Sequence, residues 1–554
     1  MISNTDITIS DNQTEAADLE IEAASGERKP SVGGRIARAA VILMAGTVLS
    51  RVVGVGREST IATLFGGGSD VGAFTVANHV ATIVYDLLIS GTVSAALVPV
   101  FSEYSENKEQ RAEFGRLVGS ILTIASIFLL LAVGLLELFA APLATFMSDG
   151  LPAEAQSLAV DMTQIVLPGV FFMGISGVVM AAHYSLHRFI YPAFTSVLFN
   201  LAIIFSAILL AGLLGVKSLA LGLVVGAFAM VAFQVPGLRD IPVRLNIDIH
   251  HPAVRKILRL YAPVGLSLIV SAVALVIDRH LASQVGDHAI GAMRYATTII
   301  QFGLGIVAAA ISLASLPTLS QHFTSGDATA FKKTLSSGLR LVTVLVLPVA
   351  AMLLALSVPV VSLLFRHGAY TQQDQDLTVL ALRLYVIGLP FSAIDQVLLF
   401  AFYARKNTLT PALIGIAQFG VYLAIAFATY RTWGMAGLVV ASSVQLAFHA
   451  IVTGTLLLRA MRNEGGLGGY GIVSTGLKVG GASVALGVVS FALWWVLTGP
   501  LGMQGTNITS QALLLGIPAL FGGLLYVALV WLMRMPEIEL ITSKVLSKLP
   551  GRGQ

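Results

Sequence analysis

Long apolar stretches separated by short polar segments dominate this chain. Each stretch runs roughly 20 residues or more, about the length that an α-helix needs to cross the hydrocarbon core of a bilayer. Because backbone polar groups in lipid must be satisfied within the segment, we expect helices. The pattern predicts fourteen spans, which start near Arg35, Val71, Leu117, Glu154, Phe189, Ser218, Val254, Ala289, Phe331, Gln375, Thr410, Gly434, Tyr470 and Gln511.

The basic residues alternate between the segments that join these spans. Cytoplasmic loops of membrane proteins carry an excess of Lys and Arg. One set of alternate segments holds 25 of the 33 basic residues, and the opposite set holds only Lys217, Arg366 and Arg431. This bias predicts an even number of spans with both termini in the cytoplasm. The remaining five basic residues lie inside spans: Arg51, Arg57, Arg279, Arg294 and Arg383.

Two motifs recur at almost the same spacing along the chain. The segment ending near Pro192 matches the segment ending near Pro411, with a shared tyrosine and a shared Pro-Ala pair at an offset of 219 residues. The motif LVPVFS at Leu97 matches SLPTLS at Ser315 at an offset of 218. Six spans separate the copies, so both copies insert in the same direction. The repeat is therefore parallel and suggests a transporter whose site lies between two lobes; chance matching of apolar sequence is the alternative.

These patterns together predict an all-α integral membrane protein with 14 transmembrane helices, arranged as two parallel-repeat six-helix lobes plus two C-terminal helices. We expect a disordered acidic cytoplasmic tail over 1–30, an N-lobe over 31–238 and a cytoplasmic linker over 239–253. A C-lobe over 254–462, the last two spans over 463–534 and a cytoplasmic tail over 535–554 complete the prediction.

Composition narrows the functional class. The chain is 56% apolar and only 11% charged, more apolar than a soluble core of this length can hide. It has no cysteine, which excludes disulfides, thiolate catalysis and cysteine metal sites. No P-loop, Rossmann glycine pattern or HExxH motif is present, so we expect no enzyme activity, no catalytic residue, no cofactor and no bound metal. The cytoplasmic segments are short, which favours an ion or membrane-potential drive over ATP.

Charged side chains inside spans are the candidate functional residues, because each costs at least about 2.5–3.5 kcal/mol at the bilayer centre. In the first span Ser50 and Arg57 share one helix face, and Arg51 and Glu58 share another. Since guanidinium groups bind phosphate bidentately, we predict an arginine-lined cavity for a phosphate-bearing substrate. The alternatives are an Arg51–Glu58 ion pair and snorkelling of the arginines to the cytoplasmic surface.

Three further spans carry polar residues. The second span has a stripe at i, i+7 and i+11: His79, Asp86 and Ser90. Its acid either pairs with a first-span arginine at the site or serves structure alone. One polar face of the eighth span should line a cavity: Arg294, Thr297, Thr298 and Gln301. Asp278, near the end of the seventh span, is a candidate for ion coupling, with simple solvation near the outer interface as the alternative.

Five motifs are specific enough to indicate a family: LSRVVGVGRESTIATLFG at Leu49, AALVPVFSEY at Ala95, LPTLSQHF at Leu316, LFRHGAYTQQD at Leu364 and FYARKNTLTPA at Phe402. With them the chain resembles the MurJ/MviN proteins of the multidrug/oligosaccharidyl-lipid/polysaccharide exporter superfamily, from about Val41 to Met461. The resemblance implies a lipid II flippase with fourteen spans, in which the last two helices form a groove for the lipid tail. Arg51 and Arg57 match arginines that the family needs in its central cavity.

The sequence departs from this family pattern at three positions where the family has basic residues: Tyr85, Asp86 and Thr298. We predict that Arg294, one turn before Thr298 on the same helix face, supplies the missing guanidinium. The alternative is that Arg294 pairs with Asp278 or Asp287 near the outer surface and never meets substrate.

The resemblance implies a bacterial cytoplasmic membrane protein that moves undecaprenyl-diphosphate-linked peptidoglycan precursor to the outer leaflet by alternating access. Its partners would be that lipid-linked glycan precursor, membrane lipids and cell-wall synthesis proteins, and not nucleic acid. Two alternatives stay open at this point. One is a flippase for another polyprenyl-diphosphate-linked glycan, and the other is a transport-silent membrane scaffold for cell-wall enzymes.

Overall fold

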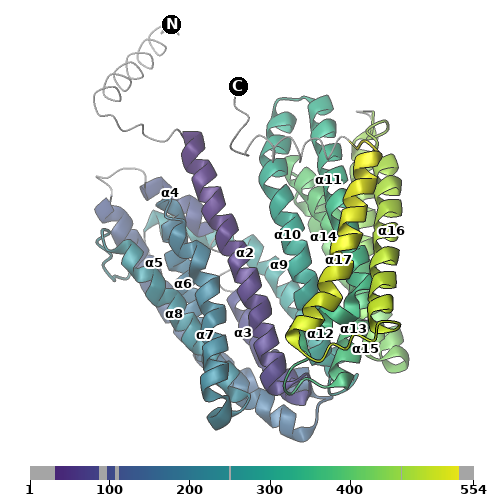
Figure 1. Ribbon diagram of the computed structural model, residues 1–554. Coiled ribbons are helices and arrows are strands. Elements are labelled where there is room, and N and C mark those ends of the chain that lie inside the picture. The colour runs from purple at the N-terminus through teal and green to yellow at the C-terminus, as the bar shows by residue number, and fades with distance from the viewer. Residues whose placement is uncertain (1–31, 87–95, 106–110, 249–250, 463–464, 536–554) are drawn as a thin grey trace, which may run out of the picture.

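The computed structural model describes residues 32–86, 96–105, 111–248, 251–462 and 465–535 (Figure 1). Within these ranges all regular secondary structure is helical. The first half contains α2 (Val32–Phe65), α3 (Ser69–Tyr85), α4 (Val98–Ser105), α5 (Arg111–Ser148), α6 (Ala153–Ser185), α7 (Ile190–Leu214) and α8 (Lys217–Gln234). The second half contains α9 (Pro252–Ser283), α10 (Ala289–Thr324), α11 (Ala328–Ala355), α12 (Ser357–Phe365), α13 (Gln372–Ala404), α14 (Leu409–Trp433), α15 (Met435–Ala460), α16 (Ile472–Thr498) and α17 (Ile508–Leu532).

The helices begin close to the predicted span starts. The largest difference is six residues, at α5, which begins at Arg111 rather than Leu117. Ten helices in the described part of the chain are long and apolar enough to cross a membrane. The other four predicted spans coincide with α2, α3, α9 and α10. The protein is therefore a multi-pass helical membrane protein, while the count of fourteen spans stays a prediction.

The internal repeat is visible in the backbone. His187 after α6 and Lys406 after α13 are 219 residues apart, and both adopt left-handed backbone conformations, with φ of 56° and 57°. In both turns three N–H groups bond back to the preceding helix at the same relative positions. Gly215 and Gly434, also 219 apart, have φ of 55° and 57° where α7 and α14 end. Matching turns at one offset confirm that the two halves repeat each other in parallel.

The contacts between helices divide the described part of the chain into two bundles. In the N-terminal bundle, α2 to α8, α7 packs on α2 and α8, and α6 packs on α3, α5 and α8. In the C-terminal bundle, α9 to α15, α13 packs on α10 and α15, and α14 packs on α15. Helices α16 and α17 pack on each other, and α16 also packs on α11 (Figure 1). The predicted residue boundaries of the lobes stay a prediction.

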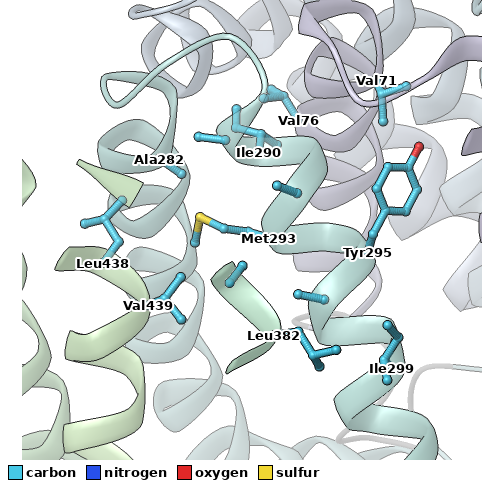
Figure 2. Packing of buried hydrophobic residues seen from close by; sticks show 14 of the residues in the cluster. Val71, Val76, Ala282, Ile290, Met293, Tyr295, Ile299, Leu382, Leu438 and Val439 are labelled. Atoms are coloured by element: carbon cyan, nitrogen blue, oxygen red, sulfur yellow. The ribbon is translucent and has the colours of Figure 1, made fainter. Parts of the chain in front are cut away.

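The two bundles share a buried core near one end of the molecule. Figure 2 shows Val76 of α3 beside Ile290 of α10, and both belong with Val71 and Met293 to one continuous buried cluster. The end of the helices that carries Arg111, Arg188, Lys332 and Arg405 is called the basic end here, and the other is called the opposite end. The shared core lies toward the opposite end, since α3 and α10 both begin there.

Hydrogen bonds also join the bundles at the opposite end. The Ala369 N–H donates to the Thr63 carbonyl at 2.8 Å, and the Tyr295 hydroxyl donates to the Gly66 carbonyl at 2.5 Å. Toward the basic end, by contrast, the apolar side chain of Val48 on α2 is 52% exposed. In Figure 1 the first turns of α2, at the basic end, are drawn apart from α10. The bundles are therefore closed against each other at the opposite end and separated toward the basic end.

The segment after α8 runs across the basic end of the N-terminal bundle. Arg188 donates to the Asp240 carboxylate at 2.6 Å, and this hydrogen bond lowers the pKa of Asp240 below its usual value. At Gly119 of α5 the Arg244 carbonyl approaches so closely that a Cβ would lie 2.0 Å from it. These contacts hold the connection between the bundles against α5 at the basic end.

Candidate functional site

A cavity of about 340 Å³ lies between α2, α7 and α10, where the two bundles separate. Five of the predicted site residues line it: Ser50, Arg51, Arg57, Thr298 and Gln301. The remaining lining residues are Gly54, Val55, Asn200, Thr297 and Phe302. None of these residues is acidic. The cavity thus presents two guanidinium groups together with hydroxyl and amide groups, which is a donor set suited to an anion.

Arg57 is held in place by two neighbours. Its Nη1 donates to Asn200 Oδ1 of α7 at 2.8 Å, and its Nη2 lies 2.5 Å from Glu58 Oε1. The Arg57 side chain is 21% exposed, so part of the guanidinium still faces the cavity. An anion in the cavity can therefore bind Arg57 without first displacing both of its neighbours.

Arg51 reaches across from α2 to α10. Its Nη1 donates to the Gln301 carbonyl at 3.0 Å. The approach is possible because α10 has Gly305 at this point, where a Cβ would lie 3.1 Å from Arg51 Nε. Arg51 is exposed, so its guanidinium has access to the cavity while it touches the other bundle. The hydrogen bond of Arg51 therefore depends directly on the distance between the two bundles.

Behind the cavity wall, Glu58 joins the bundles through an ion pair. Arg294 Nε and Nη2 of α10 donate to Glu58 Oε2 and Oε1 at 2.7 and 2.8 Å. The side chains of Glu58 and Arg294 are 1% and 8% exposed. Arg294 also lies over the Phe74 ring, with its Cζ 4.9 Å from the ring centroid. A buried bidentate pair of this kind fixes α2 against α10.

The structure gives these charges different partners from those expected. Glu58 pairs with Arg57 and Arg294 rather than with Arg51, because its carboxylate faces α10. Arg294 pairs with Glu58, and neither Asp278 nor Asp287 is its partner. In this arrangement Arg294 lies outside the cavity lining, while Thr298 lies in it. A role for Arg294 toward substrate stays a prediction.

The other predicted site residues lie elsewhere. Asp86 is exposed at the end of α3, outside the cavity lining, and Ser90 lies outside the described residues. Asp278 of α9 pairs with Arg279 at 3.0 Å and accepts a hydrogen bond from Tyr422 of α14. Ion coupling at Asp278 stays a prediction, and any ion that binds there has to compete with Arg279. In the described part of the chain no cluster of His, Asp and Glu is arranged to hold a metal.

Asn200 is the site residue that the sequence analysis missed. It lies in α7, between two apolar stretches, and its side chain both lines the cavity and bonds Arg57. An amide within an apolar span was the available signal, because polar groups at such positions usually face a partner or a cavity. The partner of Asn200 could not be predicted, because α2 and α7 are far apart in sequence.

Comparisons with known proteins identify the family of this chain. A family model described as lipid II flippase MurJ matches residues 61–506. The lipid II flippase MurJ of Burkholderia cenocepacia is 28% identical over 442 residues, which cover 77% of this chain and 84% of the relative. The probable lipid II flippase MurJ of Haemophilus influenzae is 32% identical over 391 residues, which cover 67% of this chain and 76% of the relative.

Solved structures show the same fold. A lipid II flippase MurJ in an inward closed conformation has a TM-score of 0.72 at 22% identity, covering 89% of this chain and 98% of that one. An inward-facing multidrug resistance MATE family transporter has a TM-score of 0.56 at 18% identity, covering 76% of this chain and 95% of that one. Because the family model spans most of its length, this protein belongs to the lipid II flippase MurJ family.

Proposed function

We propose that this protein moves lipid II, the undecaprenyl-diphosphate-linked peptidoglycan precursor, from the cytoplasmic to the outer leaflet by alternating access. The observation that carries the proposal is the cavity between the bundles, lined by Arg51 and Arg57 and by no acidic residue. Guanidinium groups match the oxygens of a diphosphate in charge and geometry. Names of the relatives in the same family point to the same substrate.

Charge balance supports binding of a diphosphate in particular. The cavity and the wall behind it hold three guanidinium groups, those of Arg51, Arg57 and Arg294, and one carboxylate, that of Glu58, which gives a net charge of +2. A diphosphate that links a lipid to a sugar has two ionised phosphate groups. Bound between Arg51 and Arg57, it would neutralise the cluster. A neutral cluster is much cheaper to enclose in the membrane than one with two uncompensated charges.

This balance gives a rule for alternating access. The empty protein resists closing at the basic end, because closure would bury two unmatched positive charges. The loaded protein can close there, after which the contacts at the opposite end can open. No step in this cycle makes or breaks a covalent bond. The residues bind and orient the substrate, and the bundles move around it.

Replacement of the cavity arginines tests the proposal. In cells depleted of their own flippase, Arg51→Ala and Arg57→Ala should each reach the membrane at normal abundance and fail to restore growth. Radiolabelled lipid-linked precursor should accumulate in those cells. Arg431→Ala is the matched control, because Arg431 lies outside the cavity, beside Tyr430 on α14. Normal growth with both cavity variants would refute the proposal.

A second candidate substrate follows from Thr298. Its hydroxyl lines the cavity at the position where the family resemblance implies an arginine. A neutral hydroxyl in place of a guanidinium can bond a sugar hydroxyl, so a polyprenyl-diphosphate-linked glycan other than the peptidoglycan precursor is the second candidate. Purified protein in vesicles with labelled lipid II separates the two candidates, because faster export of another lipid-linked glycan than of lipid II would favour the second.

The orientation belongs to the proposal, because lipid II is made in the cytoplasm. The basic bias puts Ser325, between α10 and α11, inside and Thr506, before α17, outside. Since the chain has no cysteine, single Ser325→Cys and Thr506→Cys variants report each side without background. A membrane-impermeant maleimide should label Thr506→Cys in intact cells and Ser325→Cys only after permeabilisation. The reverse pattern would invert the direction of transport proposed.

A further inference from the structure

A small polar pocket of about 160 Å³ lies at the opposite end of the molecule, between α12 and the C-terminal pair of helices. Figure 1 shows α12 beside the start of α17 at this end, and the two helices pack on each other. The end of α16, the start of α13 and the segment between α16 and α17 complete the wall. This α12–α17 pocket shares no lining residue with the arginine-lined cavity, so it is a separate site.

Two buried glutamines line the α12–α17 pocket. Gln375 of α13 and Gln511 of α17 are 3% and 5% exposed. Gln511 Nε2 donates to the Gly505 carbonyl at 3.2 Å, whereas the Oε1 atoms of both glutamines have no hydrogen-bond partner in the described part of the chain. A buried acceptor without a donor is destabilising. Because the amide torsion is broad, a small rotation turns each oxygen toward a donor that a ligand brings into the pocket.

Arg366 supplies the charge of the pocket. It is exposed, and among the described residues its guanidinium has no side-chain partner. None of the described lining residues is acidic. An ammonium group in the pocket would therefore be left without a counter-charge, beside a cation. The ligand that fits is neutral or anionic, and its hydrogen-bond donors are uncharged groups such as hydroxyls.

An aromatic ring forms another part of the wall. Trp494 of α16 is half-buried and lines the pocket together with the hydroxyls of Ser362 and Thr498. A flat aromatic face packs well against the C–H face of a sugar ring, while the indole N–H stays available as a donor. The volume is smaller than the roughly 300–1,000 Å³ of sites for drug-sized ligands, so it suits a ligand with a single ring.

We propose that the α12–α17 pocket binds one sugar-acid unit, a six-membered sugar ring that carries a carboxylate. The carboxylate binds the Arg366 guanidinium at the mouth, where a bidentate contact is open to it. The ring packs on Trp494, and two ring hydroxyls donate to the Oε1 atoms of Gln375 and Gln511. With the orientation proposed above, the ligand enters from outside the cell. The site does not depend on which lipid the protein transports.

Tryptophan fluorescence of the purified full-length protein tests the proposal. The chain has four tryptophans, so Trp433→Phe, Trp495→Phe and Trp531→Phe together leave Trp494 as the reporter. Glucuronate should shift its emission and saturate. Glucose, which has a hydroxymethyl group in place of the carboxylate, should bind about 5-fold more weakly. Cyclohexanecarboxylate, which has no hydroxyls, should bind about 25-fold more weakly than glucuronate, or about 5-fold for each of two lost hydrogen bonds.

Variants in this reporter protein separate the contacts. Arg366→Gln should lower the affinity for glucuronate to that for glucose and leave glucose binding unchanged. Gln375→Met with Gln511→Met should weaken glucuronate and glucose binding equally, by about 25-fold, without affecting cyclohexanecarboxylate. Methionine keeps the length of the side chain and removes the unpaired oxygen, so folding should not suffer. Arg431→Gln is the matched control, because Arg431 lies at the same end, beside Tyr430 and outside the pocket.

Three results would overturn the proposal. The first is an unchanged Trp494 emission at saturating glucuronate, which would mean that water alone fills the pocket. The second is equal glucuronate affinity of Arg366→Gln and Arg431→Gln, which would remove the recognition of the carboxylate. The third is binding of glycerol phosphate as tightly as glucuronate, which would assign the pocket to a phospholipid headgroup.

Discussion

Glu58 is the residue on which the closed contact between α2 and α10 depends. Its carboxylate is 1% exposed and is shared by Arg57 and Arg294. Breaking a buried pair by removing one partner leaves the other charge uncompensated, at a cost of about 3–5 kcal/mol. We therefore expect Glu58→Gln to lower the thermal unfolding midpoint of the purified protein markedly, because Arg294 loses its counter-charge.

The matched variant is Glu58→Gln combined with Arg294→Gln. It returns the cluster to a net charge of +2 and lets two amides bond across the same gap. We expect it to recover most of the midpoint in detergent. An unfolding midpoint for Glu58→Gln alone equal to that of the unmodified protein would show that the pair does not stabilise this state.

Exchange of Arg294 and Thr298 tests whether the position of the guanidinium matters for transport. Arg294→Thr lowers the charge of the cluster to +1, because it removes one of three guanidinium groups. Arg294→Thr with Thr298→Arg restores +2 and places the new charge in the cavity wall. We expect growth of flippase-depleted cells to fail with the single variant and to recover with the double variant. Normal growth with Arg294→Thr would exclude a role for Arg294 in the charge balance.

At the scale of single residues, the sequence indicated which side chains share one cavity, but not which residues their charged groups contact. Ser50, Arg51 and Arg57 were predicted from helical spacing and from the family motif, and they line one cavity with Thr298 and Gln301. The partners of those residues were not predictable, because Asn200 and Arg294 meet α2 only through the packing of distant helices. Spacing within one helix decides which side chains share a face. It does not decide what that face meets.

Close packing of helices rests on small residues at defined points. At Gly222 of α8 a Cβ would lie 2.9 Å from the Ile203 Cα of α7, whereas at Gly212 of α7 a Cβ would meet nothing within 4 Å. Gly222→Val should therefore force α7 and α8 apart, at about 1–3 kcal/mol, and lower membrane abundance. Gly212→Val has the same chemistry at an open position and should leave abundance unchanged. Equal abundance of the two variants would argue against this packing.

The long helices were predictable because hydropathy and length are read along the chain. The short ones were not. Helix α12, Ser357–Phe365, follows α11 after a single residue and was not expected as a separate element. It carries part of the contact between the bundles, since the Leu364 carbonyl accepts a hydrogen bond from Ser59 of α2. Its position depends on that tertiary contact rather than on a membrane-spanning length.

The end at which the two bundles are closed depends on the conformational state of the whole molecule. A transporter has to populate both states with one sequence, so the sequence alone does not select between them. The contact between Thr63 and Ala369 belongs to the state described here, with N–H and carbonyl 2.8 Å apart. Backbones this close place two Cα atoms within the range that a disulfide spans.

A disulfide at this contact tests alternating access. Thr63→Cys with Ala369→Cys in the chain, which otherwise has no cysteine, should cross-link on oxidation and stop transport. Reduction should restore transport, and each single variant should transport under both conditions. Transport by the fully oxidised double variant would mean that the opposite end does not have to open.

The net charge of +2 at the cavity also has a pharmacological consequence. A lipid whose headgroup has a single negative charge would bind Arg51 and Arg57 but would leave one positive charge unmatched. Such a molecule would occupy the site without making closure favourable. We therefore expect polyprenyl phosphodiesters, in which one phosphate joins the tail to a sugar, to act as competitive inhibitors that are bound but not transported, with potency set by headgroup charge more than by the length of the tail.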